Sequence, residues 1–97
     1  MKGTKTGESR LGVVAVFVDN RLESAPKVNQ ILSDFGHIVV GRMGIPYRER
    51  NLSVMAVIVD GTTDDIGAMT GRLGAIAGVS VKAALRRKGV ELDGGRA

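Results

Sequence analysis

Two stretches of the chain are apolar at almost every position, and each opens a similar pattern of strand, helix and strand. Residues 13–19 read Val-Val-Ala-Val-Phe-Val-Asp, and residues 54–60, which lie 41 positions later, read Val-Met-Ala-Val-Ile-Val-Asp. The same offset of 41 aligns Leu32 with Leu73 and Phe35 with Ile76. One structural unit is therefore written twice, and this repeat predicts the architecture of nearly the whole chain.

In the first unit, residues 11–18 are rich in β-branched side chains and predict a central strand. Ser24 is the expected N-cap of a helix that accepts Pro26 in its first turn. The helix is expected to end at Gly36. Its apolar stripe has the spacing i, i+3, i+4 and i+7 and consists of Val28, Ile31, Leu32 and Phe35.

Residues 37–43 close the first unit and predict a strand with a bulge or close approach at Gly41. Residues 44–51 predict a polar connection, and residues 52–59 predict the third strand. Thr62 and Asp65 have the spacing of a capping box and open the second helix. The apolar stripe of that helix is Ile66, Met69, Leu73 and Ile76, and residues 79–83 predict the last strand.

The order βαββαβ predicts an α+β fold of the ferredoxin-like kind. It has a four-stranded antiparallel sheet with two helices on one face. The two most apolar strands, the first and the third, are expected at the centre. We expect a mobile arm over residues 1–10, the domain over residues 11–85, and a basic, glycine-containing tail over residues 86–97.

Both central strands are apolar on both of their faces, whereas two helices cover only one face of a sheet. The arm and the tail are too polar and too rich in glycine to cover the other face well. We therefore expect face-to-face packing of sheets in a homo-oligomer, a dimer or a tetramer. The residues assigned to this interface are Val14, Val16, Val18, Met55, Val57 and Val59.

Composition narrows the class of protein. The chain has 97 residues and no cysteine, which excludes disulfides, thiolate zinc sites and cysteine nucleophiles, and favours a cytoplasmic location. The longest apolar runs, residues 11–18 and 52–59, are far shorter than the roughly 20 residues that span a bilayer, so no membrane association is expected.

No constellation of catalytic residues is evident, and we expect neither an enzyme nor a cofactor. His37 is the only histidine, it has no carboxylates at ligand spacing, and we interpret it as a surface residue rather than a metal ligand. RNA-recognition modules place aromatic residues on strands one and three, where this chain has only Phe17. Nucleic-acid binding is therefore not expected from the sheet.

Three glycines in the second helix, Gly67, Gly71 and Gly74, have two interpretations. They allow either close approach by a ligand or partner chain, or tight packing of the helix on the sheet, and we favour the packing. The turn of residues 60–63 before this helix resembles a phosphate-binding turn. The acidic pair Asp64 and Asp65 follows it, so we interpret the turn as a helix cap.

The net charge is +4, and the basic residues are concentrated around the central connection and at residues 86–88, where the tail begins. Arg42, Arg48 and Arg50 surround the central connection together with Tyr47 and Asn51. Such a group suits a carboxylate, a phosphate or an acidic protein surface. A solvated hairpin tip is an equally good interpretation.

The motifs at residues 42–49, 65–74 and 78–82 resemble the iron-only hydrogenase system regulators. These proteins are similar to ACT domains and to the C-terminal domain of the nickel-responsive repressor. The resemblance spans about residues 11–85 and implies an ACT-like regulatory domain that oligomerises and binds effectors where subunits meet. The repressor's nickel site uses several histidines and a cysteine, which this chain lacks. ACT amino-acid sites have a glycine after the first strand, where this chain has Asp19-Asn20-Arg21.

Three functional hypotheses follow. The first is a non-enzymatic, self-associating regulatory module with a small anionic or amino-acid effector at a subunit interface. Its candidate site residues are Asp19, Asn20, Arg21, Arg42, Tyr47, Arg48 and Arg50. The second is a scaffold subunit that binds no ligand and contacts a transcription factor or another protein through the basic hairpin. The third is nonspecific nucleic-acid binding through Arg86, Arg87 and Lys88.

Overall fold

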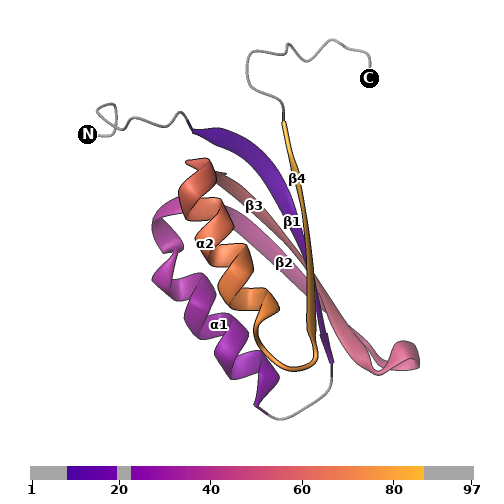
Figure 1. Ribbon diagram of the computed structural model, residues 1–97. Helices are drawn as coiled ribbons and strands as arrows, with labels where there is room; N and C mark the ends of the chain where they lie inside the picture. Colours follow the sequence, from indigo (N-terminus) through magenta and orange to yellow (C-terminus); the bar gives the residue numbers. More distant parts are fainter. Residues whose placement is uncertain (1–8, 20–22, 87–97) are drawn as a thin grey trace, which may run out of the picture.

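The computed structural model describes residues 9–19 and 23–86. The elements follow in the order β1 (Arg10–Asp19), α1 (Ser24–Asp34), η2 (Gly36–Ile38), β2 (Val39–Tyr47), η3 (Arg48–Arg50), β3 (Leu52–Gly61), α2 (Thr63–Gly74) and β4 (Val79–Leu85). The strands form one antiparallel sheet in the order β2-β3-β1-β4, and both helices lie on one face of it (Figure 1). The ferredoxin-like prediction is confirmed, with β1 and β3 at the centre.

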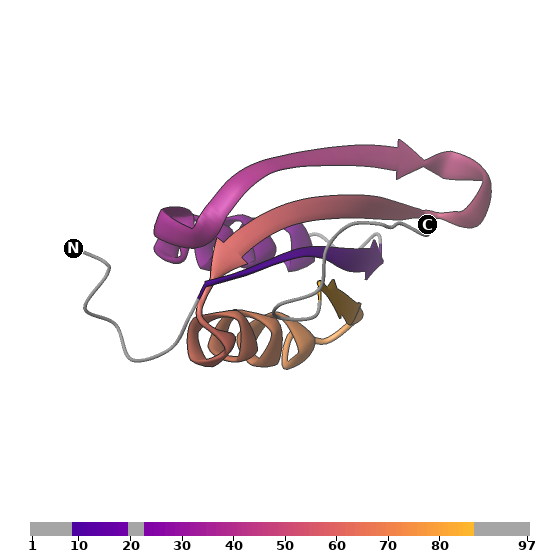
Figure 2. The same ribbon diagram turned by 90° about the horizontal axis from the view of Figure 1, so that it is seen from above.

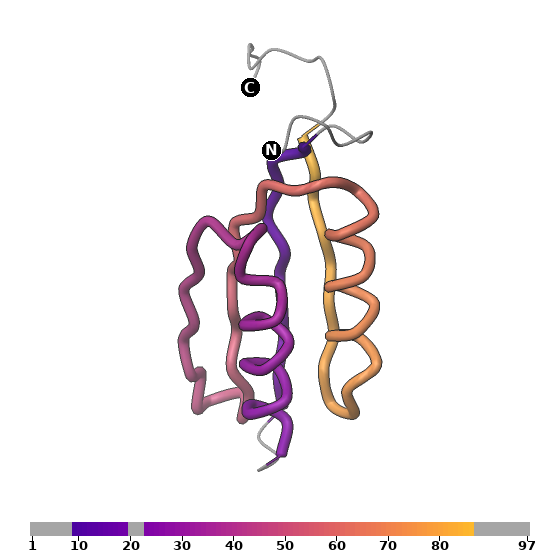
Figure 3. The backbone as a smooth tube through the Cα atoms, turned by 90° about the vertical axis from the view of Figure 1, so that its left-hand side faces the viewer, coloured from indigo at the N-terminus to yellow at the C-terminus, as the bar shows by residue number. Residues whose placement is uncertain are grey.

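The core lies between the helices and one face of the central strands. Valine side chains dominate this face because β-branched residues suit a pleated surface that is packed on one side. In the register of β1 and β3, Val14 lies opposite Val57, and Gly12 lies opposite Val59. The helices stand side by side over this face (Figure 3), and they contribute the buried side chains of Val28, Ile31, Leu32, Ile66, Met69 and Leu73.

The N-terminus of α2 is capped by a side chain, whereas that of α1 has no side-chain cap. The N-cap of α2 is Thr62, whose Oγ1 accepts a hydrogen bond from the backbone N–H of Asp65 at 3.1 Å, as predicted from the spacing. Ser24 was the wrong N-cap for α1. The cap is Glu23, and Ser24 is the first helical residue, with its hydroxyl turned inward and buried.

The β2–β3 hairpin is longer than predicted. Half of the expected polar connection over residues 44–51 is strand, because β2 runs on to Tyr47 and Pro46 is tolerated in this edge strand. His37 lies in η2 rather than in the strand, and the register shifts between Val39 and Gly41, next to the predicted bulge. The hairpin ends in η3 and Asn51, which has a φ of 56°. This end of the hairpin extends beyond the helices (Figure 2).

The residues assigned to the oligomer interface lie on the face of the sheet that the helices cover. Val14, Val16, Val18, Val57 and Val59 are at most 4% exposed and belong to the core under the helices. Met55 is half-buried and packs against the same core. The pattern of these strands is apolar on both faces, so periodicity alone does not identify the face that the helices cover.

Most of the predicted arm and tail lies outside the described residues. Arg10, which was assigned to the arm, begins β1. Arg86, which was assigned to the tail, donates its backbone N–H to the carbonyl of Leu11 at 2.8 Å. No helix in the described ranges is both long enough and apolar enough to cross a membrane.

Candidate functional site

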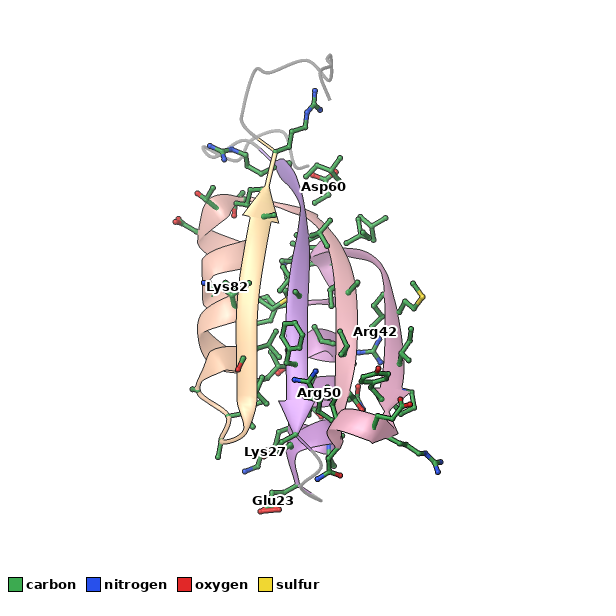
Figure 4. The ribbon with its side chains drawn as sticks, turned by 90° about the vertical axis from the view of Figure 1, so that its right-hand side faces the viewer. Glu23, Lys27, Arg42, Arg50, Asp60 and Lys82 are labelled. Carbon is green, nitrogen blue, oxygen red and sulfur yellow. The ribbon has the colours of Figure 1, made fainter. Side chains whose placement is uncertain are left out.

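The sheet face turned away from the helices carries large apolar side chains that are well exposed. We call this surface the open face (Figure 4). On β1 it includes Leu11 (47% exposed), Val13 (43%) and Phe17 (40%), and on β3 it includes Ile58 (36%). On β2 it includes Met43 (62%), Ile45 (54%) and Tyr47 (45%). These positions form continuous cross-strand rows, since Val13 lies opposite Ile58, and Val54 lies between Phe17 and Ile45.

Charged groups lie at the margins of the open face. Asp60 lies at one end of the sheet, and Lys82 lies on the outer strand β4 (Figure 4). In the register of β1 and β4, Lys82 pairs with Ala15 and Ser80 pairs with Phe17. The open face is thus an apolar centre bordered by polar residues, which is the arrangement typical of interaction surfaces.

A cavity of about 480 Å³ lies at the tip of the β2–β3 hairpin. Of the predicted effector residues, it is lined by Tyr47 and Arg48, whereas Arg42 and Arg50 do not line it. Leu52 and Ser53 also line it, although no motif in the sequence pointed to either residue. The full lining is Pro46, Tyr47, Arg48, Asn51, Leu52 and Ser53. The guanidinium, phenol, amide and hydroxyl groups in this set suit a small anion.

Asp19 belongs to the same end of the sheet but has a structural role. It lies opposite Leu52, which in turn lies opposite Tyr47. Its carboxylate accepts a hydrogen bond from the Ser24 hydroxyl at 3.1 Å, and its backbone N–H donates to the carbonyl of Gly78 at 2.9 Å. Asp19 therefore joins the start of α1 to the loop before β4 and does not line the cavity. Asn20 and Arg21 lie outside the described residues.

A second groove, of about 580 Å³, runs between α2 and the edge strand β4. Its lining includes Gly67, Gly71 and Gly74 together with Thr70 and five consecutive residues of β4, which are Val79, Ser80, Val81, Lys82 and Ala83. A Cβ built on any of the three glycines would meet no atom of the described residues within 4 Å.

The preferred interpretation of these glycines, tight packing of the helix on the sheet, was therefore wrong. The three glycines are exposed and line the groove beside β4, and a Cβ at any of them would not contact the sheet. Each glycine costs the helix about 0.8–1.0 kcal/mol relative to alanine. The packing of a single subunit does not account for that cost.

The outer surfaces of the two helices are linked by polar and ring contacts. Asp34 accepts hydrogen bonds from Gln30 Nε2 at 2.9 Å and from Arg72 Nη2 at 3.1 Å. The hydrogen bond from Gln30, and then the one from Arg72, hold the pKa of Asp34 below its ordinary value. The Arg72 guanidinium lies 5.5 Å from the centroid of the Phe35 ring.

His37 belongs to the same helix surface. Its ring centroid lies 6.2 Å from that of Phe35, and its Nε2 lies 3.5 Å from a carboxylate oxygen of Asp65. Within the described ranges, no group of three or more His, Cys, Asp or Glu side chains is arranged to hold a metal ion.

Comparisons with solved structures agree with this fold. Uncharacterized protein TM1266 from Thermotoga maritima superposes with a TM-score of 0.80 at 32% identity, over 82% of this chain and 100% of that one. An unknown protein from Galdieria sulphuraria has a TM-score of 0.61 at 18% identity, over 89% of this chain and 49% of that one. A formyltetrahydrofolate deformylase from Pseudomonas putida has a TM-score of 0.55 at 13% identity, over 76% of this chain and 28% of that one. These last two similarities show the fold alone.

The chain has no significant match among curated proteins. Residues 10–83 match the family model described as "TM1266-like: Iron-only hydrogenase system regulator, putative". The matched residues extend from the start of β1 into β4 and so include at least part of every element described above. The chain belongs to the TM1266-like family.

Proposed function

We propose that this protein is a non-enzymatic regulatory module that assembles with copies of itself through the open face and binds a small anionic or amino-acid effector in the hairpin cavity. The exposure of the open face is the observation that carries the proposal. The description of the family supports a regulatory role connected with an iron-only hydrogenase system. The corrected interface residues are Leu11, Val13, Phe17, Met43, Ile45, Tyr47 and Ile58.

The energetics favour assembly through this surface. Burying a large apolar side chain completely is worth about 1.5–3 kcal/mol, so covering one that is half exposed is worth roughly 1 kcal/mol. The open-face side chains are contributed by both partners of a symmetric contact, which doubles the gain. Summed over the open-face side chains of two copies, this free energy of burial is comparable with the roughly 4–15 kcal/mol that association costs in lost rotational and translational freedom.

Sedimentation velocity at micromolar concentration tests the assembly. We expect the wild-type protein to sediment as a dimer or a larger species, and Val13→Glu to shift it toward smaller species, because a buried carboxylate would face apolar side chains. Ala25→Glu adds the same charge on the exposed surface of α1 and is the matched control. A wild-type protein that sediments as a folded single subunit would contradict the proposal.

The hairpin cavity is the proposed effector site because it combines a charged donor with neutral donors in one concave surface. Arg48 offers a planar guanidinium that binds carboxylate or phosphate through two parallel hydrogen bonds. The cavity adjoins Tyr47, which also belongs to the open face, so an effector bound there would contact the region where copies meet. Effector binding and assembly would then be linked thermodynamically.

A thermal-shift panel of amino acids, carboxylates and phosphate esters tests the effector site. A positive ligand should raise Tm in the wild-type protein, and the shift should be lost in Arg48→Ala. Arg42→Ala is the matched control, since Arg42 belongs to the same hairpin but does not line the cavity. Equal loss of the shift in both variants would indicate general electrostatic attraction instead of a site.

A second candidate function is a scaffold that binds a protein partner without a ligand. It is favoured by the position of the hairpin, which extends beyond the helices with Arg42, Arg48 and Arg50 all exposed (Figure 2). A hairpin of this kind suits an acidic surface on a protein such as a transcription factor. The absence of a thermal shift with every ligand of the panel would favour this alternative.

A further inference from the structure

The hairpin cavity, of about 480 Å³, has an apolar and a polar part. Pro46 and Leu52 form the apolar part. Each polar side chain of the lining carries an N–H or O–H donor, and these side chains are Tyr47, Arg48, Asn51 and Ser53. Small-molecule sites typically combine an apolar surface with a few polar groups that fix the orientation of the ligand. A ligand that matches this lining has a hydrocarbon part and a negatively charged group rich in hydrogen-bond acceptors.

Building on the proposed effector site, we infer that its ligand is an α-keto acid with a branched or aromatic side chain, and not the corresponding amino acid. The Arg48 guanidinium binds the carboxylate through two parallel hydrogen bonds. The hydroxyls of Tyr47 and Ser53 are donors for the keto oxygen. The hydrocarbon part of the ligand lies against Pro46 and Leu52.

The charge of the cavity selects against an ammonium group. Arg48 brings a positive charge, and no carboxylate belongs to the lining among the described residues. An amino acid whose carboxylate is bound by Arg48 would hold its ammonium group close to the guanidinium, where two like charges repel. The ammonium group would also lose part of its hydration without gaining an anionic partner. An α-keto acid with the same carbon skeleton avoids both costs.

Two acidic residues lie close to the cavity in the sheet or in the sequence, but neither lines it. Asp19 lies opposite Leu52, yet its carboxylate accepts the hydrogen bond from the Ser24 hydroxyl and lies against Gly78. Glu49 belongs to η3 at the end of the hairpin and is exposed. An ammonium group inside the cavity would therefore gain no partner from either carboxylate.

The same charge favours a carboxylate over a phosphate monoester. A phosphate monoester carries about 1.5–2 negative charges at neutral pH, whereas a carboxylate carries a single one. In the part of the chain that the structure describes, Arg48 is the one cation of the lining, since Arg42 and Arg50 do not belong to it. A single guanidinium matches the charge and the two oxygens of a single carboxylate.

Isothermal titration calorimetry with matched ligands tests the inference. Each pair shares one carbon skeleton, α-ketoisocaproate with leucine and phenylpyruvate with phenylalanine. We expect the keto acid of each pair to bind the wild-type protein more tightly, by about tenfold or more, because it lacks the repelled ammonium group. Isocaproate, which has no keto oxygen, and phenyl phosphate should bind more weakly than the matching keto acids. Equal or tighter binding of the amino acids would overturn the inference.

Adding a carboxylate to the lining should change this preference. Asn51→Asp does so with almost no change of shape, and aspartate tolerates the φ of 56° at this position. Ser53→Asp adds the charge at a second point of the lining, and Ser53→Asn is its neutral control. In both aspartate variants the affinity ratio of keto acid to amino acid should fall by about tenfold or more, because the ammonium group gains a partner. Circular dichroism would check the fold, and an unchanged ratio in both variants would overturn the inference.

The outcomes separate this inference from the proposed effector site. If leucine or phenylalanine binds more tightly and Arg48→Ala abolishes that binding, the cavity is an effector site and the class of ligand is wrong. If none of the calorimetry probes binds, the assignment of an α-keto acid is overturned, and the wider thermal-shift panel decides whether the cavity binds any effector. Tighter binding of the keto acids that is lost in Arg48→Ala and kept in Arg42→Ala would support both.

Discussion

The hydroxyl of Ser24, the first residue of α1, donates a hydrogen bond to the carboxylate of Asp19, the last residue of β1, at 3.1 Å. Ser24 is 1% exposed, and its Oγ also lies 3.3 Å from the carbonyl oxygen of Ala77. This buried hydroxyl therefore lies where β1, α1 and the loop before β4 come together. An aspartate that resembled an effector ligand in the sequence is part of the internal structure.

We expect Ser24→Ala to lower the free energy of unfolding by about 1–2 kcal/mol. The variant removes the hydroxyl donor and leaves the Asp19 carboxylate with less compensation in a partly buried place. Urea denaturation followed by circular dichroism measures the effect. Ser33→Ala, which changes an exposed serine of the same helix, is the control and should change the stability by less than about 0.5 kcal/mol.

Gly78 should tolerate no side chain. It has a φ of 84°, and a Cβ at this position would overlap the Asp19 carboxylate. The left-handed conformation alone costs an alanine roughly 1–2 kcal/mol, and displacing Asp19 adds to it. We expect Gly78→Ala to lower the midpoint of thermal unfolding clearly. Gly36→Ala is the control because nothing in the described structure lies within 4 Å of its Cβ position.

The sequence predicted the architecture because two periodicities were unambiguous. The helical stripes through Leu32 and Leu73 and the long apolar strands leave one arrangement for a βαββαβ chain of this length. It did not identify the face of the sheet that the helices cover. One signal was present, since Asp60 has the same parity as Ile58 in the third strand and therefore marks the open face.

The orientation of the α2 glycines could have been predicted from the sequence, although the preferred interpretation was wrong. Each helical residue advances by about 100°, which places Gly71 about 160° from both Met69 and Leu73. That angle already excluded packing against the sheet. The lining of the hairpin cavity could not be predicted in this way, because Leu52 and Ser53 reach it through the unexpected extension of β2 and the turn at Asn51.

Adjacent residues of β3 should show the difference between the two faces. Val57 is fully buried and Ile58 is 36% exposed. We expect Val57→Ala to cost about 2 kcal/mol of unfolding free energy at any protein concentration, because it leaves a cavity in the core. Ile58→Ala should cost little in the isolated subunit but should weaken self-association. Unfolding measured over a hundredfold range of concentration separates the two effects, and equal behaviour would contradict the assignment of the faces.

The contact between Asp34 and Arg72 should make stability depend on pH. The hydrogen bonds from Gln30 and Arg72 lower the pKa of Asp34 in the folded protein. The stabilisation is therefore fully present above the unfolded pKa of about 3.9 and is lost as the pH falls through the lower folded pKa. Asp34→Asn should unfold at a lower temperature than the wild type at pH 7, and the difference should shrink toward pH 3. Both side chains are exposed, so added salt should reduce it too.

Glu49→Gln provides the control for this pH dependence, since it removes an exposed carboxylate from η3 at the far end of the hairpin. It should leave the midpoint of thermal unfolding unchanged at both pH values. A difference between Asp34→Asn and the wild type that stays constant from pH 7 to pH 3 would show that the charge of Asp34 is not the cause. The helices α1 and α2 would then be held together by their apolar contacts and by the packing of Arg72 on Phe35 alone.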